Sequence, residues 1–279
     1  MNYGKNEVAK KLQRSSSKAQ KVASKLVLWL VKLVLVLFTV GIILSVSLGY
    51  GIFKGIIDAA PEIDVASIEP SGYATMVYDS KANLTETLVK SGSNRLEATY
   101  EELPQCLIDA FVAIEDSRFW SHHGVDLRSM IRAAVGILTN NPAGGGSTLT
   151  QQLAKNELFT QEKQMARKAA EMFAARDIED YYSKQQIFEM YAGSCYFGNQ
   201  WSGVAQAAQG YFGKPTRELT RAECVVLAGL PNAPSVYAAN GELARRRALV
   251  VVERMERAKK LTHTQALELR DEVSALPLW

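Results

Sequence analysis

The sequence predicts a mainly α fold with a short N-terminal β-hairpin and one N-terminal transmembrane helix. Three observations predict it. An uncharged apolar run lies near the N-terminus, two short segments after it alternate apolar and polar residues, and the chain beyond Tyr100 repeats with a helical period. With 47% hydrophobic and 22% charged residues, 279 residues suffice for one sizeable folded domain and additional segments.

The uncharged run covers residues 33–53, LVLVLFTVGIILSVSLGYGIF, and is long enough as a helix to cross a hydrocarbon core of about 30 Å. Residues 1–32 hold eight Lys/Arg and one acid, a charge of +7, so the remainder of this +3 chain carries −4. The positive-inside rule then predicts a cytoplasmic N-terminus and an extracytoplasmic main domain. The alternative, a cleaved signal peptide, has a shorter apolar region of about 7–15 residues. Because the positive charge belongs to the tail, we expect no nucleic-acid partner.

The remaining organisation is predicted in order along the chain. We expect a basic cytoplasmic tail at 1–32, a transmembrane anchor at 33–53, a stalk at 54–72, a catalytic domain at 73–262 and a C-terminal extension or linker at 263–279. A hairpin is expected from strand-like alternation in 73–80 and 83–90. Asp126 is a plausible N-cap for an amphipathic helix over 127–138. Further helices are expected near 147–157, 165–182, 184–193, 203–211, 219–229 and 241–259.

Metal chemistry is weakly indicated. His122 and His123 are adjacent and would point to different sides of a helix or strand, and HExxH spacing is absent. The cysteines Cys106, Cys195 and Cys224 lack zinc-type spacing and are interpreted as small buried residues.

A carboxylate site is better supported. In AIEDSRFWSHHGVD, Glu115 follows an apolar run, so its carboxylate emerges beside apolar neighbours and suits a general base. The stretch AGGGSTLTQQLAKN, residues 143–156, allows close backbone approach at its glycines and places Ser147 to cap a helix facing an anion. The segment ARKAAE, residues 166–171, suits either a pyrophosphate contact or an ordinary salt-bridged surface. A glycine-rich loop before an amphipathic helix remains the alternative for the second stretch.

Together these segments resemble the peptidoglycan glycosyltransferase domain of glycosyltransferase family 51, over about residues 75–259. That domain occurs in monofunctional transglycosylases and at the N-terminus of class A penicillin-binding proteins. The family's five motifs appear in order, and the second is matched at all its specified positions. They are Glu115, Asp116, Phe119, His122, Gly124 and Asp126; then Gly145–Asn156; then Arg167, Lys168 and Glu171; then Lys184, Ile187 and Tyr191; and finally Arg246, Arg247 and Val250.

The resemblance implies a lysozyme-like helical fold with a membrane-contacting part around 127–145. It implies inverting polymerisation of lipid II into β-1,4 glycan strands with release of undecaprenyl pyrophosphate. Glu115 would be the general base, and Glu171 a second catalytic carboxylate that orients cations or holds a divalent ion such as Mg²⁺, with no organic cofactor. The implied substrate-binding residues are Asp116, Phe119, Ser147, Thr148, Gln151, Gln152, Lys155, Asn156, Lys163, Arg167 and Lys168.

Expected partners are lipid II, the growing glycan chain, the membrane and other cell-wall synthesis proteins. Departures from the family pattern at Lys163, Gly193 and Gln200 affect substrate positioning rather than the catalytic acids. The alternatives are a lysozyme-like glycan hydrolase and an inactive membrane-anchored scaffold. The S-x-x-K and KTG pattern of a transpeptidase is absent from the catalytic region, so the chain is a candidate N-terminal part of a bifunctional enzyme.

Overall fold

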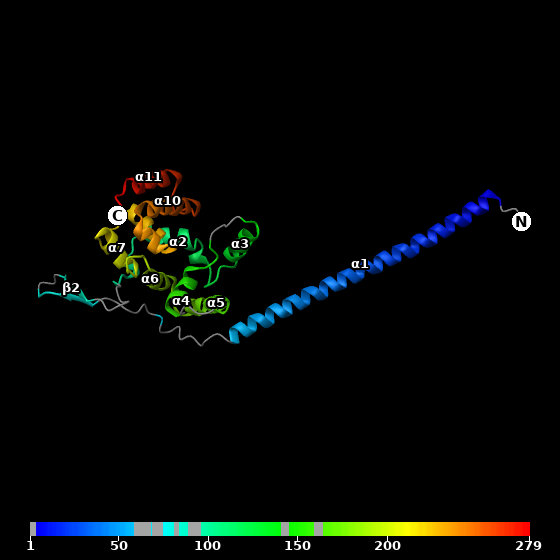
Figure 1. The fold of residues 1–279 in the computed structure, drawn as a ribbon, viewed down its shortest axis with the longest axis horizontal. Coiled ribbons are helices and arrows are strands. Elements are labelled where there is room, and N and C mark those ends of the chain that lie inside the picture. Colours follow the sequence, from blue (N-terminus) through cyan, green and yellow to red (C-terminus); the bar gives the residue numbers. More distant parts are fainter. Residues whose placement is uncertain are drawn as a thin grey trace. The chain divides into compact units, whose positions relative to one another are not determined.

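The computed structural model describes residues 4–58, 68, 75–80, 84–88, 96–140, 145–158 and 164–279. The chain divides into two compact units, Met1–Ala59 and Ala60–Trp279. The first unit is the single helix α1, and the second holds the hairpin and the helical domain (Figure 1).

Helix α1 runs without a break from Lys5 to Asp58. Its stretch Lys21–Gly51 is long and apolar enough to cross a membrane, judged by length and composition, and its most apolar part is fully exposed. The sequence predicted the span at 33–53 and a basic tail before it. The structure makes the basic residues part of the same helix, because Lys, Gln, Ala and Leu all have good helix propensity.

The hairpin that the alternating pattern predicted is confirmed. Strand β1 (Thr75–Tyr78) pairs antiparallel with β2 (Leu84–Leu88), and Thr75 lies opposite Leu88. A register irregularity falls between Val77 and Tyr78. The stalk expected at 54–72 lies outside the described residues, apart from 54–58 and Ile68.

The helical domain confirms the mainly α prediction. The Asp126 carboxylate caps α3 as expected, accepting from the backbone N–H groups of Arg128 at 3.0 Å and Ser129 at 3.1 Å. The predicted helices from 147 to 259 are found, with ends shifted by up to about two residues. The α-helices of the domain are α2 (Gln105–Glu115), α3 (Leu127–Leu138), α4 (Leu149–Leu158), α5 (Gln164–Tyr181), α6 (Lys184–Ser194), α7 (Val204–Phe212), α8 (Arg221–Gly229), α9 (Pro234–Ala239), α10 (Gly241–Arg257) and α11 (His263–Ala275).

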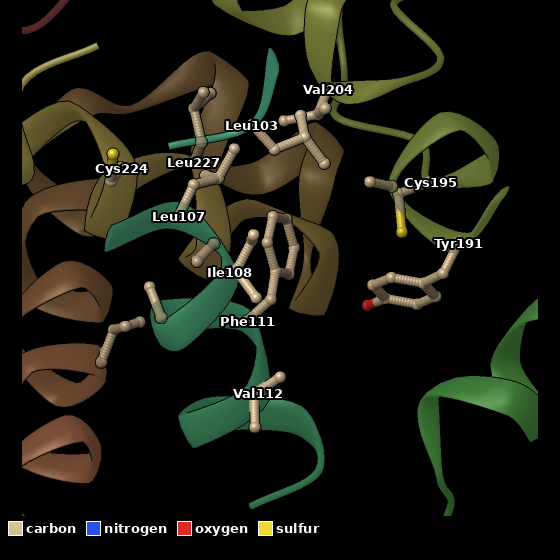
Figure 2. Close-up of a cluster of buried hydrophobic side chains, with 14 of the residues drawn as sticks. Leu103, Leu107, Ile108, Phe111, Val112, Tyr191, Cys195, Val204, Cys224 and Leu227 are labelled. Carbon is tan, nitrogen blue, oxygen red and sulfur yellow. The ribbon is translucent and has the colours of Figure 1, made fainter. Parts of the chain in front are cut away.

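Helix α2 is the centre of the domain. It packs against α8 and α10, while α4 packs against α5 and α6. Phe111 on α2 is fully buried and meets Tyr191 on α6 edge to face, with ring centroids 5.8 Å apart. Figure 2 shows these rings with Leu107, Ile108 and the neighbouring core. The buried α2 holds its C-terminal residue, Glu115, at a fixed place at the edge of the core.

The segment expected as an extension or linker, 263–279, contains α11, which packs on α8 and α10. In Figure 1, α10 and α11 lie side by side in orange and red. Ala266, Leu269 and Val273 of α11 are buried in the same core as α2 and α8. Residues 263–275 therefore belong to the helical domain.

Two of the cysteines differ from the expectation of separate buried residues. Cys106 on α2 and Cys224 on α8 form a disulfide, with their Cα atoms 6.1 Å apart, whereas Cys195 is buried and belongs to no disulfide. The partners are 118 residues apart in sequence, so spacing gave no signal of the pairing. The packing of α8 on α2 brings them together.

Candidate active site

A cleft of about 690 Å³ lies where the end of α2, the start of α4, α5 and α10 approach one another. Two carboxylates and six cationic side chains line it, so the lining is strongly positive. The carboxylates are Glu115 and Glu171; the cations are Arg132, Lys155, Lys168, Arg247, Arg254 and Arg257. Such a lining favours an anionic ligand.

Glu115 is the last residue of α2 and lies where the buried core meets the cleft. Its helix ends there because the backbone of Asp116 turns to an extended φ of −152°, and the Glu115 side chain is 18% exposed. Gln152 Nε2 donates a hydrogen bond to Glu115 Oε2 at 3.0 Å, and Arg247 Nη2 lies 3.9 Å from Oε1. The carboxylate is thus oriented by α4 and α10 while it remains open to the cleft, as a general base requires.

Tyr191 fixes the orientation of Gln152. The Tyr191 hydroxyl donates to Gln152 Oε1 at 3.4 Å, which leaves the Gln152 amide N–H to face Glu115. Burial, followed by the nearby Cys195 and Glu115, raises the pKa of Tyr191 well above 10.0. The phenol therefore keeps its proton and acts as a donor throughout the neutral pH range.

Glu171 organises the opposite wall. Its side chain is 3% exposed, and Lys168 Nζ lies 2.8 Å from its Oε2. The same ammonium donates to Ser147 Oγ at 2.8 Å, so the glycine-rich stretch before α4 is tied to α5. Glu171 thereby holds the Lys168 ammonium at the cleft surface.

Lys155 points into the cleft from α4 and is exposed. Within the described part of the chain, its ammonium makes no hydrogen bond or ion pair. A cation without a protein partner is available for a ligand. Lys163 lies outside the described residues, as does the side chain of Arg167.

Some residues expected to touch substrate instead build the wall. Asp116 is buried, and its Oδ2 accepts from the Leu149 backbone N–H at 3.0 Å and lies 2.7 Å from His122 Nε2. Phe119 is fully buried beneath the Lys184 ammonium. These groups meet one another rather than the cleft, because the turn after α2 folds back onto the start of α4. Their role is to hold the site together.

Some residues of the second motif line the cleft, and others make contacts that hold the cleft wall in place. Thr148 Oγ1 donates to the Gly124 carbonyl at 2.6 Å, and Gly124 has a φ of +77°, where an added Cβ would lie 2.6 Å from Ala175 O. Only glycine allows that close approach. Gln151 lines the cleft but also accepts from the Thr148 N–H at 3.0 Å, whereas Asn156 bonds Ser194 Oγ at 3.3 Å outside the cleft lining.

A protein-built metal site at Glu171 would need further ligands beside that carboxylate. Among the described residues, no group of three or more His, Cys, Asp or Glu is placed to hold a metal ion. The adjacent Lys168 ammonium is a poor neighbour for Mg²⁺, which prefers oxygen ligands. The side chains present do not fit a metal centre built by the protein. A divalent ion here stays a prediction, and no chemical step is assigned to it.

The histidines of the first motif have different nearest partners. His122 is held by Asp116, whereas His123 Nε2 lies 2.8 Å from Asp180 Oδ1 at the exposed surface. Both rings also lie near one buried carboxylate, since the Nδ1 atoms of His122 and His123 are each 3.9 Å from an oxygen of Glu179.

Helix α10 contributes residues to the site that the sequence did not predict. Arg247 and Val250 belong to the fifth family motif, Arg254 and Arg257 lie outside the five motifs, and all four line the cleft. The four positions are separated by 3, 4 and 3 residues, the spacing of one helix face, and this periodicity was the available signal. Arg132 on α3 and Asn232 were also missed, and no local pattern marks them.

These features agree with comparisons to known proteins. The transglycosylase family profile matches residues 81–256, more than half of the chain. The chain therefore belongs to this family and carries a peptidoglycan glycosyltransferase domain. The domain it matches is mainly helical in this structure.

The individual relatives are longer proteins. Penicillin-binding protein 1A of Vibrio cholerae is 37% identical over 242 residues, covering 84% of this chain and 29% of the relative. Penicillin-binding protein 1A of Escherichia coli is 36% identical over 248 residues, covering 87% and 29%. A crystal structure of penicillin-binding protein 1A from Haemophilus influenzae is 23% identical, covers 75% of this chain and 21% of that one, and has a TM-score of 0.40. The chain thus spans less than a third of these proteins.

Proposed function

We propose that this protein polymerises lipid II into β-1,4 glycan strands and releases undecaprenyl pyrophosphate, with inversion at the reacting carbon. The observation that carries the proposal is the placement of Glu115, oriented by Gln152 and Arg247, in a cleft lined by six cations. A base and an anion-stabilising surface in one cleft suit glycosyl transfer from a pyrophosphate donor.

In the proposed step, Glu115 removes the proton from the acceptor GlcNAc 4-hydroxyl. The oxygen attacks C1 of the donor sugar, and the bond from C1 to the pyrophosphate oxygen breaks. The electron pair of that bond stays on the pyrophosphate, which leaves as an anion and needs no strong acid to protonate it. The proton that Glu115 accepted passes to solvent afterwards.

The leaving group requires cations rather than an acid. Lys155 is available for this role, and Lys168 is held at the cleft surface by Glu171 and Ser147. Arg167 and Lys163, implied by the family resemblance, would add to the same charge. A glycan hydrolase has a neutral sugar as leaving group and gains little from six cations, so this lining favours the transferase over the hydrolase.

A lipid-linked substrate also requires a membrane-facing enzyme. We propose that α1 anchors the protein in the bacterial cell membrane as a single span, with a cytoplasmic N-terminus and an extracytoplasmic catalytic domain. One face of α3 supports a further membrane contact, because Leu127, Ile131, Val135 and Leu138 are 51% to 85% exposed. Exposed apolar side chains at helical spacing are typical of a surface that enters the lipid interface.

The experiment is polymerisation of labelled lipid II by the full chain in detergent, beside Glu115→Gln. We expect long glycan from the wild type and none from the variant, since the amide keeps the size of the side chain but cannot take up the proton. The free energy of unfolding should change by less than about 1 kcal/mol, because Glu115 lies at a cleft surface. Glu218→Gln, at a residue outside the cleft lining, is the matched control and should stay active.

Other results would select a different function. Cleavage of preformed glycan by the wild type would favour the hydrolase. A well-folded wild type that yields no product would favour the inactive scaffold. The relatives are named penicillin-binding proteins, and we propose that these residues work beside a penicillin-binding domain and with other cell-wall synthesis proteins. The intact mass of the native protein would test for the further domain. Co-purification would test for the partner proteins.

A further inference from the structure

The positive charges of α1 lie on one face of the helix. At about 100° per residue, six of the seven basic residues of 5–32 whose side chains the structure describes fall within an arc of about 100°. From the second of them onward they are separated by 3, 7, 4 and 7 residues. They are Lys10, Lys11, Arg14, Lys21, Lys25 and Lys32. One acid, Glu7, shares the arc, so its net charge is strongly positive.

Apolar side chains form a second, separate arc on the same part of the helix. Val8, Leu12, Val22 and Leu26 fall within about 80° of one another at the same helical period. They are 44%, 66%, 66% and 61% exposed, so nothing in the described part of α1 covers them. A helix with a basic arc beside an apolar arc has the composition of a helix that lies in a membrane interface.

Helix α1 is much longer than a membrane span, so a straight α1 would project far into the solvent on the N-terminal side. Its 54 residues would measure about 80 Å, far more than the hydrocarbon core of about 30 Å. The Ser24 hydroxyl donates to the Lys21 carbonyl at 3.0 Å, and a serine bonded back to its own helix often bends it. A bend at this point would let residues 5–22 turn away from the spanning segment.

We propose that residues 5–22 lie on the membrane surface and bind the anionic headgroups of the leaflet on the N-terminal side. The inference rests on the proposed membrane anchoring. The basic arc is complementary in charge to phosphate headgroups, and long Lys and Arg side chains reach them while the apolar arc enters the interface. The segment is continuous with the apolar stretch Lys21–Gly51, which already holds it at the bilayer.

The test uses the full chain in lipid nanodiscs with an environment-sensitive dye on Leu12→Cys. The native cysteines should not react, because Cys195 is buried and Cys106 is paired with Cys224. Spin-labelled headgroups should quench the dye in discs that contain phosphatidylglycerol, and much less in pure phosphatidylcholine. High salt should reverse the quenching. Each basic residue of the arc within residues 5–22, changed to Gln, should lower the ratio of docked to free segment about fivefold, corresponding to about 1 kcal/mol.

Lys5→Gln is the matched control, since Lys5 lies outside the arc, and should have less effect than Lys11→Gln. Equal quenching in neutral and anionic discs would mean that apolar insertion alone docks the segment, and no quenching in either would mean that it stands away from the bilayer. Either result overturns the proposal. Failure of the chain to enter nanodiscs would contradict the anchoring instead. The Gln variants should retain lipid II polymerisation, because the basic arc lies outside the cleft. If the unsubstituted protein does not polymerise lipid II, that result contradicts the proposed function and leaves the docking proposal unaffected.

Discussion

At the scale of single residues, the site depends on a relay of hydrogen bonds that no single motif contains. Tyr191 orients Gln152, and Gln152 orients Glu115, so three helices fix one carboxylate. Glu115, Gln152 and Tyr191 belong to the first, second and fourth family motifs, and the sequence predicted Glu115 and Gln152, but not Tyr191, as site residues. It could not give the direction in which the Gln152 amide points, because that follows from the packing of α6 against α4.

Tyr191→Phe should lower kcat about two- to tenfold while leaving KM nearly unchanged. The variant loses a neutral hydrogen bond, worth about 0.5–1.5 kcal/mol, and frees the Gln152 amide to rotate. Because the pKa of Tyr191 is raised well above 10.0, the loss should be the same at every pH of the neutral range. Steady-state polymerisation at several pH values measures it.

Tyr211→Phe is the control for that variant. The Tyr211 hydroxyl donates to the Phe197 carbonyl at 2.8 Å, outside the cleft lining, so kcat should not change. An equal loss of kcat in both variants would mean that a general loss of packing, rather than the orientation of Gln152, explains the effect.

At the scale of the elements, the sequence was most informative where periodicity was strong. The capped helix α3 and the hairpin were predicted correctly, whereas α11 and the Cys106–Cys224 pair were not. The difference is physical: caps and strand alternation are local, but burial of α11 and pairing of α2 with α8 depend on contacts between residues far apart in sequence. The same reasoning explains why the arginines of α10 were missed, since they reach the cleft only through helix packing.

Gln200 marks a turn where the chain departs from the family. Its φ is +62°, a left-handed conformation that disfavours side chains other than glycine, and Asn199 before it has a φ of +50°. Gln200→Gly should therefore raise the free energy of unfolding by up to about 1 kcal/mol, after the entropy lost by glycine is subtracted. Asn199→Gly should gain less, because Asn tolerates this conformation better. Denaturant unfolding measures both, and a destabilised Gln200→Gly would refute the strain argument.

Glu223 makes the start of α8 sensitive to acid. Burial alone would raise its pKa, but hydrogen bonds from Lys214 Nζ and the Thr220 backbone N–H outweigh burial and hold the pKa below 4.5. Its stabilisation is therefore complete above about pH 4.5 and is lost as the pH falls through the lowered folded-state pKa. Glu223→Gln should lower the free energy of unfolding by about 1 kcal/mol at neutral pH, and the difference from the wild type should shrink in acid.

Thermal unfolding at neutral pH and near pH 3 measures the effect. Glu218→Gln is the reference, since the Glu218 side chain is 60% exposed and lies 3.9 Å from Arg217. A stability difference for Glu223→Gln that stays constant with pH would show that the carboxylate charge is not the cause.

At the scale of the whole molecule, the disulfide and the charge of α1 make independent predictions about topology. A disulfide persists in an oxidising compartment outside the cytoplasm, whereas the positive-inside rule places the basic end of α1 in the cytoplasm. The two agree only if the chain crosses the membrane between them, and among the described residues Lys21–Gly51 is long and apolar enough to do so. In the proposed topology, the catalytic domain would lie on the side where Cys106 and Cys224 can remain oxidised.

Protein purified under alkylating conditions should accordingly take up one alkyl group per chain when denatured without reductant, at Cys195, and three after reduction. Because the bond joins residues 118 apart, its reduction should lower the free energy of unfolding by roughly 2–5 kcal/mol. Cys106→Ser and Cys224→Ser should each reproduce that loss, while Cys195→Ser should not respond to reductant differently from the wild type. Uptake of three alkyl groups without reductant would show that both thiols are free. That result would remove the disulfide from the argument for an extracytoplasmic domain and leave the topology to the charge distribution alone.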